Sequence, residues 1–217
     1  MNFEQARLNM VEQQIRPWEV LDQTVLETIT AIPRDEFVPP TYRTLAYSDT
    51  AIPLGYGEEM MTPKLEARIV QSLNLRTTDR VLEIGTGSGY LTAIMAHLAG
   101  HVTSVEIVPS FCAAAKSKLD AHGITNVLFE QGDGIDGWKL RAPFEAIVLT
   151  GSVASARPLI ERQLTIGGRL FIIVGTSPIM DACLVTRLSE TEFSTESLFE
   201  TTIIPLRGGQ AEPRFQF

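Results

Sequence analysis

The chain lacks several features that point to particular classes of protein. Its 217 residues include only two cysteines, Cys112 and Cys183, which lie far apart and form neither a disulfide framework nor a zinc-binding pattern. No apolar run is long enough to cross a membrane, and the first residues lack the apolar core of a secretory signal. These absences favour a globular protein with reduced thiols, and we expect a cytoplasmic location and no bound metal.

Positive charge is also scarce. Lys and Arg total 18 against 26 Asp and Glu, so the net charge is −8 and the pI is about 4.9. A sequence-independent grip on phosphate groups needs clustered basic residues, and the sequence has no such cluster, so we expect no nucleic-acid partner. The length and the 44% hydrophobic content fit a single domain over residues 1–217 with a large core.

Hydrophobic periodicity divides the chain into a helical extension with a substrate-side loop, residues 1–78, and an alternating unit, residues 79–217. In the first part the pattern predicts helices at 3–15, 22–32 and 63–75, and a long loop at 46–56. Asp22 and Thr62 are the expected helix caps. In the second part it predicts strands and helices in alternation: strands 81–84, 102–107, 127–131, 146–150, 170–174, 182–188 and 198–204, and helices 90–98, 110–122 and 155–164.

This alternation is typical of an α/β fold. We expect a mostly parallel seven-stranded sheet with helices on both faces, closed by an antiparallel hairpin. The first strand of the alternating unit, Arg80-Val81-Leu82-Glu83-Ile84, runs into a glycine-rich turn, Gly85-Thr86-Gly87-Ser88-Gly89. Glycine has no Cβ and accepts positive φ, so a ligand can approach the backbone there, and the amides of the following helix face that ligand.

The spacing of the glycines indicates which ligand this is. A dinucleotide site needs G-x-G-x-x-G, whereas here the third glycine, Gly89, comes one residue early, which disfavours a nicotinamide dehydrogenase. A G-x-G-x-G turn after an acidic strand residue, here Glu83, is the form that methyltransferases use for S-adenosylmethionine (SAM). On its own the pattern is also compatible with a simple tight turn.

Later strands end in side chains that suit the same ligand. Glu106, before Ile107, ends the second strand and can accept both ribose hydroxyls, although a surface glutamate is the simpler alternative. Gly132-Asp133-Gly134 follows the third strand, and Asp133 can accept an adenine amine unless it only forms a turn. Thr150 ends the fourth. Ligands of such sheets bind at the carboxyl ends of the strands, so these residues together predict a SAM site.

The chain resembles the protein-L-isoaspartate O-methyltransferases over nearly its whole length. The matching stretches include Ile32-Pro33-Arg34-Asp35-Glu36-Phe37-Val38-Pro39 and Ile52-Pro53-Leu54-Gly55-Tyr56-Gly57, with 10–15, 46–49, 81–90, 132–134, 137–138 and 142–144. The resemblance implies a Rossmann-like methyltransferase fold with SAM as cofactor and S-adenosylhomocysteine as product. It implies methylation of the free carboxyl of L-isoaspartyl residues in damaged proteins, and we expect a monomer. The implied cofactor residues are Glu83, Gly85, Thr86, Gly87, Gly89, Glu106, Ile107, Gly132, Asp133 and Gly134.

One stretch departs from the family. The family usually reads Gln-Thr-Ile-Ser-x-Pro with an active-site serine, whereas this chain reads Glu58-Glu59-Met60-Met61-Thr62-Pro63. The Met61 thioether cannot donate a hydrogen bond, and the two glutamates would repel an anionic acceptor if they face it. Met61, Thr62 and Thr150 are the candidate catalytic positions. A same-fold enzyme with another acceptor, or a non-catalytic SAM-binding module, stays open. The tail from Pro205 also differs from the family's usual ending.

Overall fold

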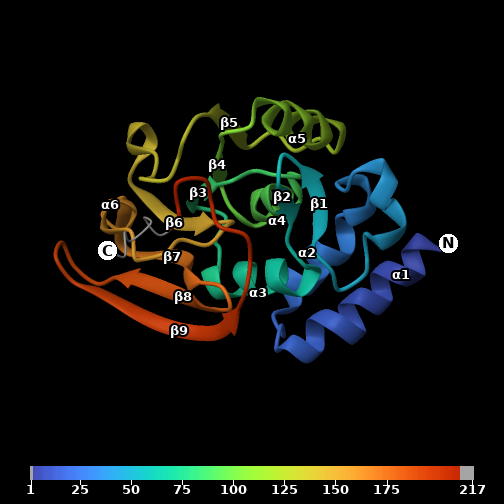
Figure 1. Cartoon of the computed structure of the whole chain (residues 1–217), viewed down its shortest axis with the longest axis horizontal. Coiled ribbons are helices and arrows are strands. Elements are labelled where there is room, and N and C mark those ends of the chain that lie inside the picture. Colours follow the sequence, from blue (N-terminus) through green and yellow to red (C-terminus); the bar gives the residue numbers. More distant parts are fainter. Residues whose placement is uncertain (1, 211–217) are drawn as a thin grey trace, which may run out of the picture.

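The computed structural model describes residues 2–210 (Figure 1); tail residues 211–217 lie outside the described part. A seven-stranded sheet has the order β5-β4-β3-β6-β7-β8-β9. Neighbouring strands from β5 to β7 pair in parallel, and β7, β8 and β9 pair antiparallel. The strands are β3 (Arg80–Ile84), β4 (His101–Glu106), β5 (Val127–Gln131), β6 (Phe144–Leu149), β7 (Leu164–Thr176), β8 (Ile179–Arg187) and β9 (Phe193–Thr201). The predicted sheet and closing hairpin are confirmed.

The helices are α1 (Phe3–Met10), α2 (Gln23–Ala31), α3 (Pro63–Leu73), α4 (Tyr90–Leu98), α5 (Pro109–Ala121) and α6 (Pro158–Glu161). A π-helical turn (Val11–Ile15) and a 3₁₀ turn (Arg16–Trp18) extend α1, and further 3₁₀ turns lie at Arg34–Glu36, Pro40–Leu45 and Lys139–Arg141. In Figure 1 the blue N-terminal segments lie on the right of the parallel strands and the orange β8–β9 hairpin lies on the lower left. No helix within residues 2–210 is long and apolar enough to span a membrane.

The sheet separates two apolar cores because successive strand residues point to opposite faces. Val81 of β3 belongs to the larger core, which also holds Met10 and Phe37 from the N-terminal part. Leu82, its neighbour, belongs to the smaller core, which α6 covers through Ile160. The N-terminal part therefore shares a hydrophobic core with the sheet.

The predicted loop at 46–56 was partly wrong. Residues Ile52–Gly55 form β1, which pairs antiparallel with β2 (Glu58–Met60). Ile52 and Met60 face each other and are both buried, while the turn between the strands has positive φ at Gly55, Tyr56 and Gly57. Burial of one face stabilises this short hairpin despite a composition typical of loops.

Two further elements differ from the prediction. The helix expected at 155–164 is only the short α6, because Val153 bridges to Val174 and Leu164 already starts β7. The last strand runs from Phe193 to Thr201, since its ladder with β8 begins at the Arg187–Phe193 pair. The chain after it instead crosses to the end of β6, where the Ser152 amide donates to Ile204 at 3.1 Å. We call residues 202–209 the C-terminal strap.

Candidate active site

The glycine turn after β3 is held in place by the end of β6. Gly85 and Gly87 have φ of 95° and 52°, in the left-handed region that favours glycine. The Thr150 hydroxyl lies 2.8 Å from the Gly85 carbonyl oxygen and 3.0 Å from that of Ile84. A Cβ added to Gly85 would overlap the Thr150 hydroxyl oxygen. Thr150, expected to act on the acceptor, therefore lies at the site with its hydroxyl turned to the glycine backbone.

Gly89 has a different place from the other two glycines. It is the left-handed N-cap of α4, with φ of 84°. A Cβ there would lie 2.8 Å from the Cβ of Ala115, in the helix that follows β4. Gly89 thus lets α4 and α5 approach closely, and it does not line the cofactor pocket described next.

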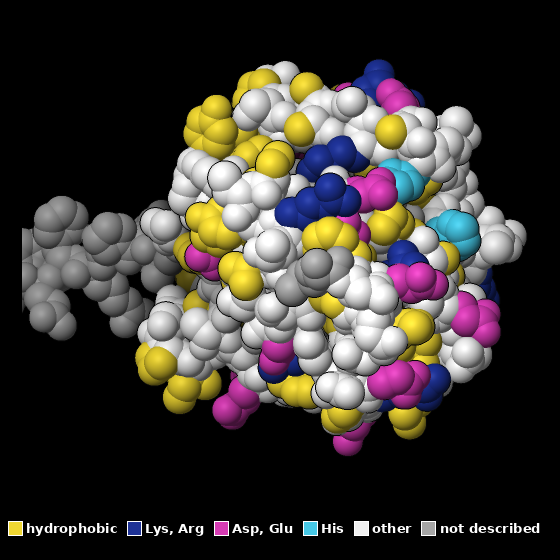
Figure 2. Space-filling view, turned by 90° about the vertical axis from the view of Figure 1, so that its right-hand side faces the viewer, with side chains coloured by type: hydrophobic (Ala, Val, Ile, Leu, Met, Phe, Trp, Pro, Cys, Tyr) yellow, Lys and Arg dark blue, Asp and Glu magenta, His cyan; other side chains and the backbone are white. Residues whose placement is uncertain are grey.

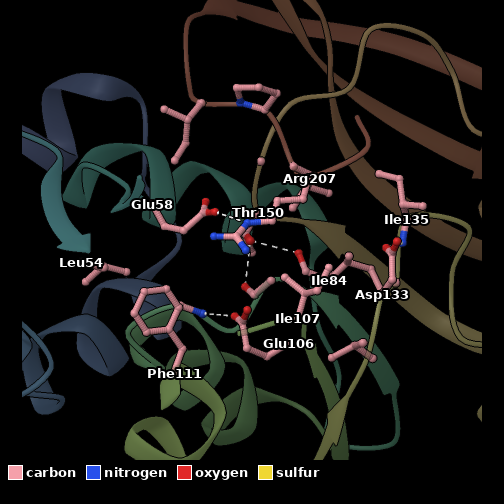
Figure 3. A pocket seen from close by; sticks show the side chains of 18 of the residues that line it. Leu54, Glu58, Ile84, Glu106, Ile107, Phe111, Asp133, Ile135, Thr150 and Arg207 are labelled. Atoms are coloured by element: carbon pink, nitrogen blue, oxygen red, sulfur yellow. Dashed lines mark hydrogen bonds and ion pairs between the residues drawn. The ribbon is translucent and has the colours of Figure 1, made fainter. Parts of the chain in front are cut away.

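A pocket opens at the carboxyl ends of β3, β4 and β6 and after β5 (Figure 3). Glu106 on its wall is 4% exposed. One carboxylate oxygen accepts from the Gly87 amide at 2.9 Å and the other from the Val108 amide at 2.8 Å. Each carboxylate oxygen keeps a further lone pair, so Glu106 can bind a diol while it also fixes the glycine turn.

The far side of the pocket suits a flat heteroaromatic ring. Ile107, Phe111 and Ile135 supply apolar surface. Asp133 accepts from the Ile135 amide through one carboxylate oxygen at 3.0 Å, which leaves the other oxygen for a ligand donor. Gly134 lets the chain next to Asp133 pack closely against Ile84, because a Cβ at this position would lie 2.8 Å from the Ile84 side chain. Glu106 and Asp133 thus offer acceptors for a ribose and for an exocyclic amine.

Glu83 lies deeper, and it is fully buried. Its Oε2 accepts from Thr92 at 2.6 Å and from Ser104 at 2.5 Å, and the Thr86 hydroxyl lies 2.5 Å from that of Ser104. Within residues 2–210 its Oε1 has no hydrogen-bond partner. Burial raises the pKa of Glu83 to about 8. A buried carboxylate with one unsatisfied oxygen beside a ligand hollow fits the α-ammonium of SAM.

This raised pKa gives a pH prediction. Below about pH 8 the Glu83 carboxyl is protonated in the ligand-free protein, and a cationic ligand favours its ionised form. We expect SAM binding to release protons and to strengthen between about pH 6 and pH 8. The free energy of unfolding of the ligand-free protein should fall over the same rise in pH. In this range the folded protein keeps the Glu83 proton, whereas the unfolded chain, with its lower Glu83 pKa, has already lost it.

Calorimetry in two buffers of different ionisation enthalpy measures the proton release. Glu66, whose pKa burial raises to about 7, also titrates in this range, so Glu83→Gln is needed to isolate one group. Proton release that is the same in the wild-type protein and in Glu83→Gln would contradict this assignment.

The acceptor side is anchored by a buried ion pair. Arg34 is fully buried and pairs with Glu66, which is 2% exposed. Its other terminal nitrogen donates to the Met61 carbonyl oxygen at 2.5 Å. Its guanidinium lies over the Tyr90 ring, 5.0 Å from the centroid. Arg34 therefore ties the chain at Met61 to both α3 and α4.

Met61 and Thr62 lie where the sequence predicts an acceptor site. Both line a groove that also includes Thr150, and Met61 lines the hollow beside Glu83 as well. Thr62 occupies the N-cap of α3, but its side chain makes no capping hydrogen bond, so the expected capping contact was wrong. The amide of Leu65, the third helical residue and a usual partner of such a cap, instead donates to the Thr62 backbone carbonyl oxygen at 3.1 Å. The Thr62 hydroxyl is consequently directed to no helix amide.

A second ion pair lies on the wall of the cofactor pocket. Arg207 in the C-terminal strap lies 2.8 Å from Glu58 of β2 and donates to the Tyr56 carbonyl oxygen at 3.1 Å. Figure 3 shows Arg207 reaching toward Glu58 with Thr150 close by. Glu58, one of the two glutamates expected to repel an anion, is thereby neutralised, whereas Glu59 has no such partner within residues 2–210.

Removal of the Arg207–Glu58 ion pair should release the cofactor faster. We expect Arg207→Ala to raise the SAM dissociation rate by up to about fivefold, because an exposed ion pair contributes about 0.2–1 kcal/mol. Stopped-flow displacement measures the rate. Arg141→Ala, which removes an exposed pair with Glu130 away from the pocket, is the matched control. The double variant Glu58→Arg with Arg207→Glu keeps the ion pair with its charges exchanged and should release SAM slowly. An unchanged rate in Arg207→Ala together with fast release from the double variant would contradict a role of this ion pair in retaining SAM.

Charges elsewhere are mixed. On the face shown in Figure 2, which carries the N-terminal end, Lys and Arg side chains lie beside Asp and Glu and do not gather in one basic patch. Close polar contacts of the N-terminal segments include the Arg43–Asp35 ion pair at 2.8 Å and the His122 Nε2, 3.0 Å from a Glu36 carboxylate oxygen. This face therefore shows no extended basic surface.

Some site residues have no clear signal in the sequence. Arg207 meets Glu58 across 149 positions, and Arg34 meets Glu66 across 32. Phe111, two residues into α5, could have been found because it closely follows Glu106. The glycine turn, Glu106 and Asp133 do lie around one pocket.

Taken together, the sheet order, the turn after β3 and the carboxylates at the strand ends define a Rossmann-like methyltransferase. A profile of the family "Protein-L-isoaspartate(D-aspartate) O-methyltransferase (PCMT)" matches residues 5–211. The chain belongs to this family.

Similar proteins agree with this assignment. The chain is 43% identical over 209 residues to "Protein-L-isoaspartate O-methyltransferase" of Syntrophus aciditrophicus, and 38% identical over 208 residues to "Protein-L-isoaspartate O-methyltransferase 2" of Marinobacter nauticus. Each alignment covers 95% of both chains. A solved protein-L-isoaspartate O-methyltransferase matches with a TM-score of 0.80 and 27% identity, over 92% of this chain and 65% of that longer one. A Plasmodium falciparum structure with S-adenosyl-L-homocysteine matches in fold, with a TM-score of 0.77, 19% identity and coverage of 95% and 98%.

Proposed function

We propose that the chain transfers the methyl group of SAM to the free carboxyl of L-isoaspartyl residues in peptides and proteins. The observation that carries the proposal is a nucleoside pocket next to an open groove, with Thr150 lining both. The family assignment supports the isoaspartyl carboxyl as the acceptor. The unsatisfied Oε1 of Glu83 supports SAM as the donor.

The residues around the pocket have distinct roles in this proposal. Glu106 binds the ribose hydroxyls, Asp133 the adenine amine and Glu83 the α-ammonium. When bound, SAM would supply a methyl group attached to a positively charged sulfonium sulfur, and that sulfur would become a neutral thioether on transfer. The acceptor carboxylate needs no general base, because its pKa of about 4 leaves it ionised at neutral pH. The protein mainly orients the acceptor and excludes water, and the half-buried Met61 gives the site apolar surface.

We assign the hydrogen bond that the family's serine would make to the Thr62 hydroxyl, which no helix amide engages. Thr62→Val should lower kcat/KM for an isoaspartyl peptide by about 2- to 10-fold, the effect of one hydrogen bond of about 0.5–1.5 kcal/mol. Met61→Ser should raise kcat/KM by a similar factor and should rescue Thr62→Val. Met61→Ala opens the same space without a hydroxyl and is the matched control. Equal gains from serine and alanine would contradict the need for a donor.

A repair assay tests the proposed function. Methoxide is a better leaving group than the oxide of a carboxylate, so the nitrogen of the following backbone amide can attack the ester carbonyl carbon. The amide proton leaves with methoxide as methanol, and the resulting succinimide hydrolyses partly to normal aspartate. We expect SAM-dependent conversion of an isoaspartyl peptide to its aspartyl form, and chromatography that separates the two peptides measures it. Turnover on other acceptors alone would identify a same-fold enzyme of different specificity, and SAM binding without any turnover would identify a binding module.

We also propose that the chain acts as a monomer in the cytoplasm. Cys112 and Cys183 are free thiols in the structure, as a reducing compartment requires. Light scattering at micromolar concentration measures the mass, and a dimer mass would contradict the monomer.

A further inference from the structure

The groove beside the cofactor pocket carries an unusual balance of charge. It lies between the chain at Met61, the start of α3 and residues 200–204, and its open space is about 850 Å³. Its charged residues are Glu59, Lys64 and Glu200. Glu59 and Glu200 are exposed, and within residues 2–210 neither side chain makes a hydrogen bond or ion pair. A substrate that enters this groove therefore meets two carboxylates.

The lysine of the groove is already engaged. The Lys64 ammonium lies 2.7 Å from the Asp49 carboxylate and 4.3 Å from the centroid of the Trp18 ring. Its charge is thus compensated within the protein. The uncompensated charge that lines the groove is negative, which disfavours acidic substrate segments and favours cationic ones.

Glu59 has a central place in this arrangement. It lines the cofactor pocket, the hollow beside Glu83, the acceptor groove, and a second cavity beyond the strap that includes Ser152 and Thr176. No other residue within 2–210 lines all four of these spaces. A peptide that binds in this groove beside Thr150 and Met61 therefore lies near Glu59.

We propose that Glu59, assisted by Glu200, selects acceptor peptides that carry a lysine, an arginine or a free amino group close to the isoaspartyl residue. Glu59 and Met61 are two positions apart in the chain, and alternate residues of an extended substrate peptide lie about 7 Å apart. The favoured cation therefore lies within about two residues of the isoaspartyl residue. This inference rests on the proposed function, because it assumes an isoaspartyl acceptor.

The experiment measures kcat/KM for matched isoaspartyl peptides in which one position, two residues before or after the isoaspartyl residue, is lysine, glutamine or glutamate. We expect the wild-type enzyme to prefer lysine over glutamate by about 2- to 10-fold at one of these positions. The preference should shrink as salt rises from about 20 mM to 500 mM, since the charges are exposed. If Glu59 had only a structural role, its substitution would change kcat/KM for all the peptides by the same factor. The ratio of kcat/KM between the lysine and glutamate peptides would then stay the same.

Three variants complete the test. Glu59→Gln should reduce the lysine-to-glutamate ratio toward one, and Glu59→Asp should retain it. Glu190→Gln removes the same charge from the exposed turn between β8 and β9 and should leave the ratio unchanged. A ratio that persists in Glu59→Gln, or a wild-type ratio of one with active transfer, would overturn the inference alone. No transfer to any isoaspartyl peptide would instead overturn the proposed function, and the inference with it.

Discussion

Glu106→Ala is expected to weaken SAM binding by about 1–3 kcal/mol, which is about 5- to 150-fold in Kd. The substitution removes the acceptors for the ribose hydroxyls. It also leaves the Gly87 and Val108 amides, which now donate to this carboxylate at 2.9 and 2.8 Å, without their partner. The turn that shapes the pocket therefore loses support at the same time as the ligand loses two hydrogen bonds. Titration calorimetry measures Kd.

Two further variants sharpen this result. Glu106→Gln should not restore affinity, because its NH₂ group would face one of the two backbone amides, donor against donor. Glu130→Ala, on the neighbouring strand but outside the pocket, should bind SAM like the wild-type protein. If Kd is unchanged in Glu106→Ala, then Glu106 does not contact the cofactor.

Gly85→Ala is expected to weaken SAM binding by about 10- to 150-fold, which is about 1.4–3 kcal/mol. Alanine is strained at a φ of 95°, and its Cβ would overlap the Thr150 hydroxyl oxygen. The turn must therefore shift or lose its contact with the end of β6, and both changes displace the backbone that lines the pocket.

A double variant separates strain from overlap. Gly85→Ala with Thr150→Ala removes the hydroxyl, so affinity should recover in part while the φ strain stays. Gly123→Ala is the matched control, because its φ is 68° but its Cβ would meet open space. Gly123→Ala should lower the free energy of unfolding without changing the Kd for SAM. If the double variant binds no better than Gly85→Ala, the overlap with Thr150 is not what weakens SAM binding in Gly85→Ala.

The parts of the fold that follow from the sequence are those set by local pattern. The β3 strand, its glycine turn and the carboxylates at strand ends are contiguous motifs, and the Asp22 cap is confirmed by its 3.0 Å bond from the Val25 amide. Parallel strands bring their carboxyl ends together, so residues that end separate strands converge on one pocket without any knowledge of side-chain contacts.

The parts that do not follow depend on contacts between distant segments. The β1–β2 hairpin exists because Ile52 and Met60 bury the same face. The short α6 exists because the chain before it bridges from Val153 to Val174 of β7. Likewise Thr62 looks like a cap in the sequence, yet no capping bond forms. Local propensity decides none of these outcomes, since each follows from which surfaces the folded chain buries.

The most direct test of methyl transfer to an isoaspartyl carboxyl uses SAM labelled in its methyl group and two peptides that differ only in an L-isoaspartyl or a normal aspartyl residue. We predict base-labile label, characteristic of a methyl ester, on the isoaspartyl peptide and little on its aspartyl twin. Transfer to neither peptide, or equal transfer to both, by protein shown to bind SAM would contradict the account.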